Sequence, residues 1–311
     1  MKSLRMFRPA VAIAGLSVLT GAMASAQYTF VKIKVPVTGA GNAAPYGISN
    51  QNDIVGLYSI KGQRGVIKSF LRTGTKPPQW TFLGDPASDG KITAAYGVNS
   101  SRTVVGYFQP SRGVFDGFLY TGGVYSSIVE PGCKDTEVDG INDHGDLAGY
   151  CYMGRTSEGW VYTSSNNSTT FFAVPGASNT VATALNSSDQ VGGFYQGGPH
   201  VVGFVRASNG TITTYDYPGS VPSWLWGISD VSNRGDQWIS GYFENPDGSF
   251  HGYLNLNGTY SQIDVPGAKS TTVTGVNVRG WFVGVYQDTL GHYFGYYAKP
   301  SSGASVLIDE E

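Results

Sequence analysis

Residues 96–107 read YGVNSSRTVVGY, and this stretch decides the fold because variants of it recur along the chain. The shared elements are a Gly-aliphatic pair, then Asn or Ser, a short polar loop, two aliphatic residues and a second glycine. The other copies occupy residues 46–57, 139–150, 183–194, 226–242 and 274–285. The fourth copy replaces the first glycine with Ala184, and the fifth carries an insertion. The chain therefore contains six copies of one unit, about 43–50 residues apart.

Two further segments follow in each unit. One is an aromatic-aliphatic pair, usually after glycine, as in Gly252-Tyr253-Leu254, and the other ends in Pro-Gly, as in Ile263-Asp264-Val265-Pro266-Gly267. Short β-branched or aromatic runs separated by Gly, Asn, Asp, Ser and Pro are typical of strands and turns. Each unit is thus predicted to supply four strands and no helix.

Six four-stranded units of this length predict an all-β fold, a β-propeller of six blades. The main alternative is a parallel β-solenoid, but solenoid coils are shorter and lack the hairpin turns. Asn or Ser after the Gly-aliphatic pair is expected to form an Asx-type turn between the first two strands, a structural role. The segment Val31–Pro36 has no first, second or third strand of its own unit. It is therefore expected to close the ring as the outer strand of the last blade. Residues 305–309 compete for that place or add a fifth strand.

Composition agrees with this prediction. Of 311 residues, 44 are Gly, 13% are aromatic and only 14% are charged, which argues against disorder and long surface helices. Residues 1–26 have a basic start, an apolar core and the small-residue motif Ala24-Ser25-Ala26, which predicts a secretory signal peptide. The single propeller domain is then expected over residues 27–311. We expect a secreted, extracellular or periplasmic, monomeric protein with no transmembrane segment.

Loss of the signal removes three of the 20 Lys and Arg, leaving 17 against 22 Asp and Glu. This acidic balance without a basic cluster disfavours nucleic acid as a partner. Cys133 and Cys151 are the two cysteines, and in an exported protein such a pair predicts a disulfide. The alternative is two free thiols, which lack the C-x-x-C spacing of a redox pair.

The repeat resembles that of the bacterial extracellular HAF-family proteins. Residues 250–254, FHGYL, and residues 263–268, IDVPGA, match the family pattern closely, and the resemblance spans roughly residues 28–310. Other copies depart from it, with Asp116, Glu158 and Val202 in place of the histidine. The resemblance implies a secreted repeat protein and brings no reaction or ligand with it.

No catalytic motif or cofactor signature occurs at a convincing position, so no cofactor and no metal are expected. His200, His251 and His292 fall in or beside the loops between second and third strands. In a propeller these loops are too far apart to share one metal without converging. His144 lies in a turn on the opposite face and is expected to be solvated.

The candidate ligand site lies where the first strand of each unit begins, at the mouth of the central channel. Aromatic rings and carboxylates together suit a sugar, because rings stack on its faces and carboxylates accept its hydroxyl hydrogen bonds. Alternatively, the aromatic residues are core and the acids form a solvated rim, with Asp135 beside them. The residues expected to bind a glycan or cell-surface ligand are Trp224, Trp226, Tyr46, Tyr96, Asp139 and Glu137.

A binding module is the function that these residues favour. The alternative is an extracellular polysaccharide hydrolase or lyase that uses Glu137 with Asp139 or Asp135 as its acid–base pair. Acids on one strand are poorly placed to flank a bond from two sides, which disfavours catalysis.

Overall fold

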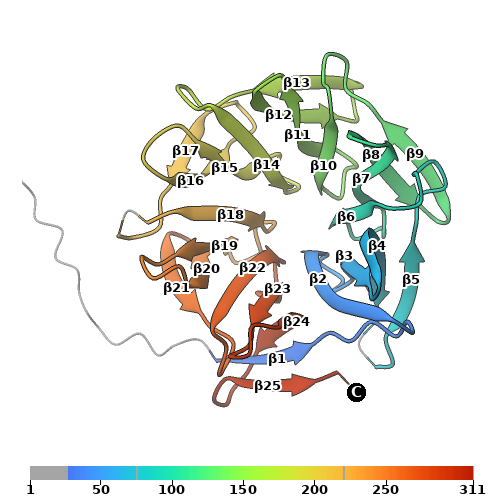
Figure 1. Cartoon of the computed structure of the whole chain (residues 1–311). Coiled ribbons are helices and arrows are strands. Elements are labelled where there is room, and N and C mark those ends of the chain that lie inside the picture. The colour runs from blue at the N-terminus through green and yellow to red at the C-terminus, as the bar shows by residue number, and fades with distance from the viewer. Residues whose placement is uncertain (1–26, 75, 220, 311) are drawn as a thin grey trace, which may run out of the picture.

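The computed structural model describes residues 27–74, 76–219 and 221–310, and this part of the chain forms a ring of β-meanders around a central channel (Figure 1). The predicted class, an all-β propeller, is confirmed. No described segment is a helix long and apolar enough to cross a bilayer. The predicted signal peptide, residues 1–26, lies outside the described residues.

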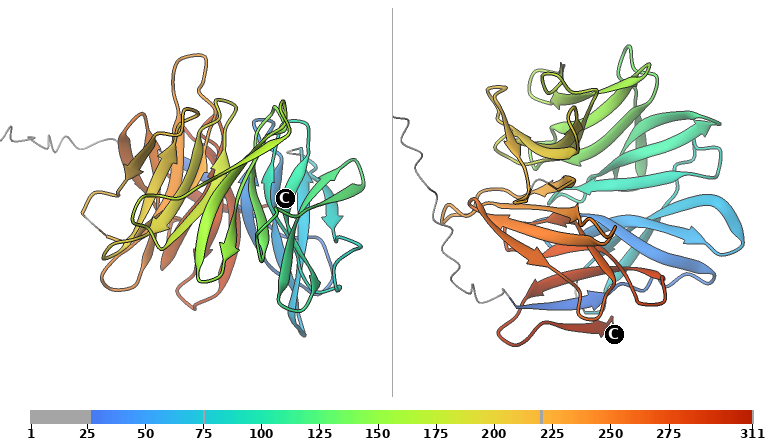
Figure 2. Two further views of the ribbon diagram at one scale, coloured as in Figure 1. Left: turned by 90° about the horizontal axis from the view of Figure 1, so that it is seen from above. Right: turned by 60° about the vertical axis from the view of Figure 1, so that its left-hand side comes forward.

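Each of the first five repeats forms four consecutive antiparallel strands, and the sixth forms three, which the terminal strands complete. In every unit the first strand lies nearest the channel (Figures 1 and 2). The first three units contain β2 (Ala40–Ile48), β3 (Ile54–Ile60), β4 (Gln63–Thr73), β5 (Gln79–Leu83); β6 (Thr93–Val98), β7 (Val104–Ser111), β8 (Val114–Thr121), β9 (Val124–Ile128); β10 (Thr136–Ile141), β11 (Leu147–Met153), β12 (Thr156–Thr163), β13 (Ser168–Phe172). The next two contain β14 (Asn179–Leu185), β15 (Val191–Gln196), β16 (Val201–Arg206), β17 (Ile212–Tyr215); β18 (Ser223–Ile228), β19 (Trp238–Glu244), β20 (Phe250–Leu256), β21 (Thr259–Ile263). The last contains β22 (Ser270–Val276), β23 (Phe282–Gln287) and β24 (Tyr293–Pro300), joined by β1 (Tyr28–Lys32) and β25 (Val306–Asp309).

The hydrogen-bonded sheets differ from the prediction of six separate blades. The described strands form five sheets, because one parallel bridge between Ser157 and Asn179 joins the third and fourth units into an eight-stranded sheet. The other sheets have four strands, except the last, which has five.

The ring closes through both ends of the described chain. Strand β1 pairs antiparallel with β24, and β25 adds to its outer side as a parallel fifth strand (Figures 1 and 2). The closing strand was expected at Val31–Pro36, but it is Tyr28–Lys32, since Tyr28 and Phe30 bury their rings against Phe282. The terminal segment is also fixed by an ion pair between buried Arg72 and Glu310.

A β-bulge interrupts the first strand of every unit at the same position. Each register shift leaves one residue without a partner, and all six such residues line the central channel: Tyr46, Tyr96, Asp139, Thr183, Trp226 and Thr274. Bulges re-aim side chains, which is why residues of a repeated strand point into the channel.

The two glycines of the repeat make this geometry possible. A Cβ on Gly106 would overlap the backbone oxygen of Ala94 in the bulged strand, and a Cβ on Gly149 would overlap that of Glu137. The first glycine allows close contact with the neighbouring unit, since a Cβ on Gly97 would lie 2.8 Å from the backbone oxygen of Asp139. The glycines therefore let strands approach closely both within and between units.

The Asn and Ser turns have the predicted structural role. The Asn142 Oδ1 atom accepts hydrogen bonds from the backbone N–H groups of His144 and Asp146, and the Asn142 amide donates to the carbonyl of Asn186 in the next unit. Asn99, Asn186 and Asn277 make equivalent bonds to their neighbours. These amides thus both shape the turns and join adjacent units.

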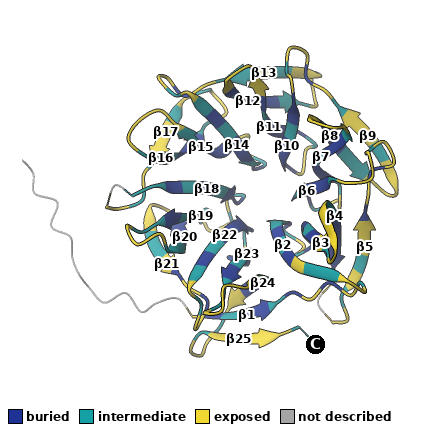
Figure 3. Cartoon of the chain, viewed as in Figure 1, coloured by how far each residue is buried: buried dark blue, intermediate teal, exposed yellow. Residues whose placement is uncertain are grey.

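The hydrophobic core lies between units rather than in one centre (Figure 3). In one such cluster, Val55 and Leu71 of the first unit pack with Val104 and Phe118 of the second. Each sheet buries both faces only because it has a neighbour on either side. The predicted disulfide is present, and it joins Cys133, just before β10, to Cys151 on β11.

Candidate ligand-binding site at the channel mouth

A cavity of about 490 Å³ opens where the third, fourth and fifth units meet at the entry end of the channel. Four of the six predicted binding residues line it: Tyr96, Glu137, Asp139 and Trp226. Its size falls within the roughly 300–1,000 Å³ that is usual for ligand pockets. The bulge explains the convergence, because three of these four residues are the unpaired residues of their strands.

The aromatic part of the site is continuous. The ring centroid of Tyr46 lies 4.5 Å from that of Tyr96 and 5.6 Å from that of Trp226, and Phe194 lies 5.8 Å from Trp226. All four side chains are half-buried. They come from four different units, so the channel mouth presents aromatic surface from several directions.

Trp224 lies elsewhere. It belongs to β18 and pairs with Tyr242. Its indole stacks on Tyr242 at 5.1 Å and meets the edge of Phe250, rings of its own unit. It does not line the cavity, whereas Trp226, two residues on, does.

The two carboxyl groups are buried rather than part of a solvated rim. Asp139 is only 5% exposed, and its Oδ1 has no hydrogen-bond partner among the described residues. Glu137 is half-buried, and its Oε2 accepts a hydrogen bond of 2.7 Å from the Tyr150 hydroxyl.

Burial disfavours the charged form of both groups. It raises the pKa of Glu137 to about 7, although the hydrogen bond from Tyr150 opposes the shift. Burial, and then repulsion from Glu137, raise the pKa of Asp139 well above its ordinary value. The two carboxyls therefore form a pair in which burial favours the neutral forms.

Several cavity residues were not predicted. Tyr150 and Phe194 line it from the second strands, at the position that follows the second glycine of the repeat. That repeated aromatic position was visible in the sequence and could have indicated them. Arg155, in the β11–β12 hairpin, and Asn179 and Gln196 complete the lining, and no repeat marks them.

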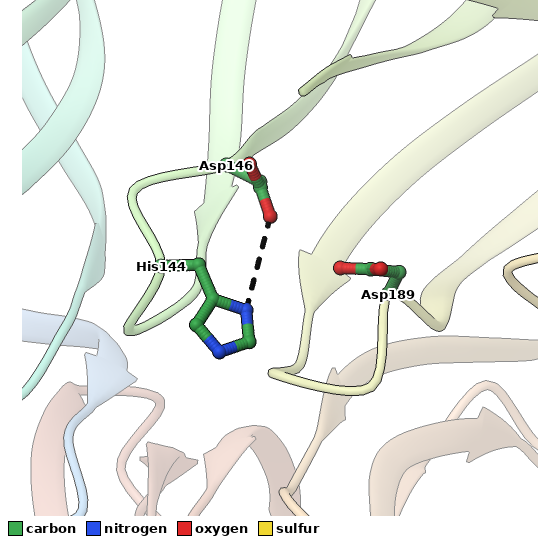
Figure 4. A group of neighbouring side chains, drawn as sticks. All are labelled: His144, Asp146 and Asp189. Atoms are coloured by element: carbon green, nitrogen blue, oxygen red, sulfur yellow. Dashed lines mark ion pairs between the residues drawn. The ribbon is translucent and has the colours of Figure 1, made fainter. Parts of the chain in front are cut away.

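The opposite mouth carries the group His144, Asp146 and Asp189, which lie on two neighbouring turns (Figure 4). One nitrogen or oxygen atom of each lies within 4.8 Å of the others, a spacing compatible with a metal ion. However, the Asn142 amide donates to Asp146 at 3.0 Å and reaches Asp189 at 3.5 Å. The turn bonds to Asn142 Oδ1 fix that amide's orientation, so its two N–H groups are shared among Asp146, Asp189 and the Asn186 carbonyl. We assign these residues to turn structure.

The loop histidines each pair with an aspartate of their own unit. His200 meets Asp216 at 3.4 Å, and His292 meets Asp288 at 3.2 Å.

The third histidine lies in a serine–histidine–aspartate series. His251 meets Asp264 at 2.7 Å and Ser249 Oγ at 3.1 Å, in the order of a hydrolytic triad. The Ser249 hydroxyl, however, donates its one proton to Asp247 at 2.6 Å. It is therefore not activated by His251 in the way a nucleophile requires.

Comparison with known proteins supports the fold. No protein-family model matches the chain, and no curated protein matches it in sequence. AofleA from Arthrobotrys oligospora is similar in structure, with a TM-score of 0.51 and 13% identity over 90% of this chain and 91% of that one. A luciferin-regenerating enzyme has a TM-score of 0.51 and 11% identity, over 90% of this chain and the whole of the other. At such identities the likeness establishes the class, a β-propeller, and nothing about activity.

Proposed function

We propose that the protein is an exported binding module that holds a carbohydrate in the channel-mouth cavity. The observation that carries this proposal is the convergence of aromatic faces, buried carboxyls and amide side chains on one cavity of about 490 Å³. A pyranose ring offers apolar faces to aromatic rings and hydroxyls to polar groups, so it matches this lining. The disulfide fits an oxidising compartment.

Catalysis on a polysaccharide is the second candidate, and one observation favours it. A carboxyl such as Glu137, with its pKa raised to about 7, suits a general acid. Both carboxyls come from β10, however, and the bulge residues of the other units are Tyr, Trp and Thr. A hydrolase needs two carboxyls on opposite sides of the scissile bond, so binding is the better-supported function.

The test is a glycan-array screen of the secreted protein, followed by calorimetry on the hits and a reducing-end assay. We expect at least one glycan class to bind without being cleaved. Release of reducing ends without unsaturated ends would replace the binding proposal with the hydrolase, and reducing ends that appear together with unsaturated ends would indicate a lyase.

A matched pair of variants locates the site. Trp226→Leu removes an indole from the cavity and should weaken glycan binding by about 1–3 kcal/mol, as expected for an aromatic hot spot. Trp224→Leu removes an indole from the same strand outside the cavity and should leave the affinity unchanged. Thermal melts of both variants separate loss of binding from loss of folding. Equal losses of affinity at unchanged stability would place the ligand outside the cavity.

A further inference from the structure

Asp139 is the one carboxyl among the six bulge residues. In the fourth and sixth units the same position is threonine, and each hydroxyl donates to a carbonyl of the next unit: Thr183 to Leu225 at 3.0 Å and Thr274 to Pro45 at 2.8 Å. Asp139 is equally buried and lines the cavity, but its Oδ1 has no partner among the described residues. An unpaired buried carboxyl is costly, so folding alone gives no reason for it.

The surroundings of Asp139 favour positive charge. Glu137 is the next carboxyl on the same face of β10, and Tyr96 and Trp226 line the same cavity. Aromatic faces carry negative quadrupoles that attract ammonium groups, most strongly in desolvated sites. In the described part of the chain no Lys or Arg forms an ion pair with either carboxyl, and the one cationic side chain of the cavity lining, Arg155, is exposed.

We propose that this cavity selects sugars that carry a free amine, with the ligand's ammonium group paired to Asp139 and the sugar ring against Trp226 and Tyr96. This inference rests on the proposed function and deepens it by naming the ligand class. The ammonium would supply the missing partner of Asp139, and the aromatic rings would accommodate both the cation and the apolar face of the sugar. A neutral acetamido sugar fills the same space but leaves the carboxyl unpaired.

Binding should release a proton. The ionisable groups that face Asp139 are Glu137, Tyr46, Tyr96, Tyr107 and Tyr150, with Asp135 acting on Glu137 and Arg155 at the exposed rim. Every tyrosine of this set has a raised pKa and stays neutral. The carboxyl pair is thus the group that titrates near neutrality. An ammonium ligand favours the ionised form of the carboxyl, so the proton leaves to solvent, and affinity rises with pH as long as the ligand's own amine stays protonated.

The experiment compares two ligands of the same length and linkage by calorimetry: a β-1,4-linked glucosamine tetramer and its fully N-acetylated counterpart. We expect the wild type to bind the amine tetramer about 10-fold more tightly at pH 7.5, the difference that one charge-assisted contact supplies. Repeating the titration in buffers of different ionisation enthalpy should show proton release only for the amine tetramer.

Two variants test the assignment. Asp139→Asn keeps the shape of the side chain and should lose the roughly 10-fold preference, because affinity for the amine tetramer should fall by more than affinity for the acetylated tetramer. Glu158→Gln removes a carboxylate of the same unit from β12, outside the cavity lining, and should keep the preference.

The outcomes are distinct. Equal affinity for both tetramers, or a preference that survives in Asp139→Asn, overturns the amine selection and leaves the glycan-binding proposal standing. If the protein binds neither tetramer but binds other glycans on the array, the amine selection alone is overturned. Failure of every glycan overturns both proposals.

Discussion

The two mouths of the channel are built from the same repeat, but they differ in how their polar groups are used. One mouth is formed by the turns between the first and second strands and is called the turn mouth. There Asn142 and its counterparts accept hydrogen bonds from the turn N–H groups and also donate to the next unit. At the entry mouth, Asp139 is buried without a partner for its Oδ1 within the described residues, and Glu137 carries a raised pKa.

This difference indicates that one mouth of the channel stabilises the fold and that the other is available to bind a ligand. Satisfied buried hydrogen bonds stabilise a fold, whereas unsatisfied ones and perturbed carboxyls are concentrated at functional sites. The turn mouth is therefore structural, although it contains the group His144, Asp146 and Asp189, and the entry mouth is the candidate site.

Removal of Gln27–Pro36 should have the largest effect, because it opens the ring and disturbs both mouths. The deletion exposes partners of Tyr28, Phe30, Val31 and Ile33, all buried against the last and first units. Each loss of a large core side chain costs about 2–5 kcal/mol, so the remaining chain should be largely unfolded at 25 °C. Circular dichroism melts provide the measurement, and truncation after Ser305, which removes the outer strand β25 and the ion pair of Glu310 with Arg72, should lower the melting temperature less. A deletion that melts like the wild type would exclude closure through this strand.

Asn142→Ala should be the next most damaging and should act on the turn mouth alone. It removes an acceptor for two turn N–H groups and a donor to Asn186, and should cost about 2–4 kcal/mol of unfolding free energy. Urea denaturation measures this loss. Glycan affinity at the opposite mouth should stay within about 2-fold of the wild type at a temperature where the variant is folded. A large loss of affinity in the folded variant would show that the two mouths are coupled.

Asp139→Asn should stabilise the protein, and the gain should depend on pH. Because the folded-state pKa of Asp139 lies above its unfolded value, the unfolded chain ionises first as pH rises, and the wild type loses stability above about pH 4. The variant lacks this cost, so it should match the wild type near pH 4 and exceed it by about 1–3 kcal/mol at pH 8. Thermal melts across this range measure the difference. Destabilisation of the variant at pH 8 would mean that the carboxylate has a structural partner.

His144→Ala should have the smallest effect. Its side chain is exposed, and its backbone N–H, not its ring, donates to Asn142. The unfolding free energy should change by less than about 0.5 kcal/mol. Addition of Zn²⁺ or Mn²⁺ should not raise the melting temperature of the wild type relative to this variant. A metal-dependent difference between them would revive a metal site at the turn mouth.

Much of the fold could be predicted from the sequence because the repeat carries it. The paired glycines, the Asn or Ser turn and the Pro-Gly segments set strands and turns locally, and the disulfide was predicted from the cysteine pair in a chain with a signal peptide. The closing strand was placed three to four residues too far along the chain, since apolar residues continue from Tyr28 to Val35 and only packing against Phe282 distinguishes the two placements.

The candidate site was predicted only in part. Asp139 and Trp226 were indicated because they vary at a repeated position, but nothing local distinguishes Trp224 from Trp226. The bulge between Leu225 and Gly227 distinguishes them, because it turns the Trp226 indole into the channel and leaves the Trp224 indole against Tyr242. Arg155 and Gln196 carry no repeat signal, since their role depends on which hairpins meet at the cavity.

The sequence by itself determined the repeated unit, its strands and turns, and the position that faces the channel, because these depend on backbone conformations that glycine, Asn and Pro select locally. Only the tertiary structure decided that the third and fourth units share one sheet, that two acids are buried together, and that one of them lacks a partner. Burial, pKa and unsatisfied hydrogen bonds are properties of the surroundings, and for Asp139 those surroundings come from units far apart in the chain.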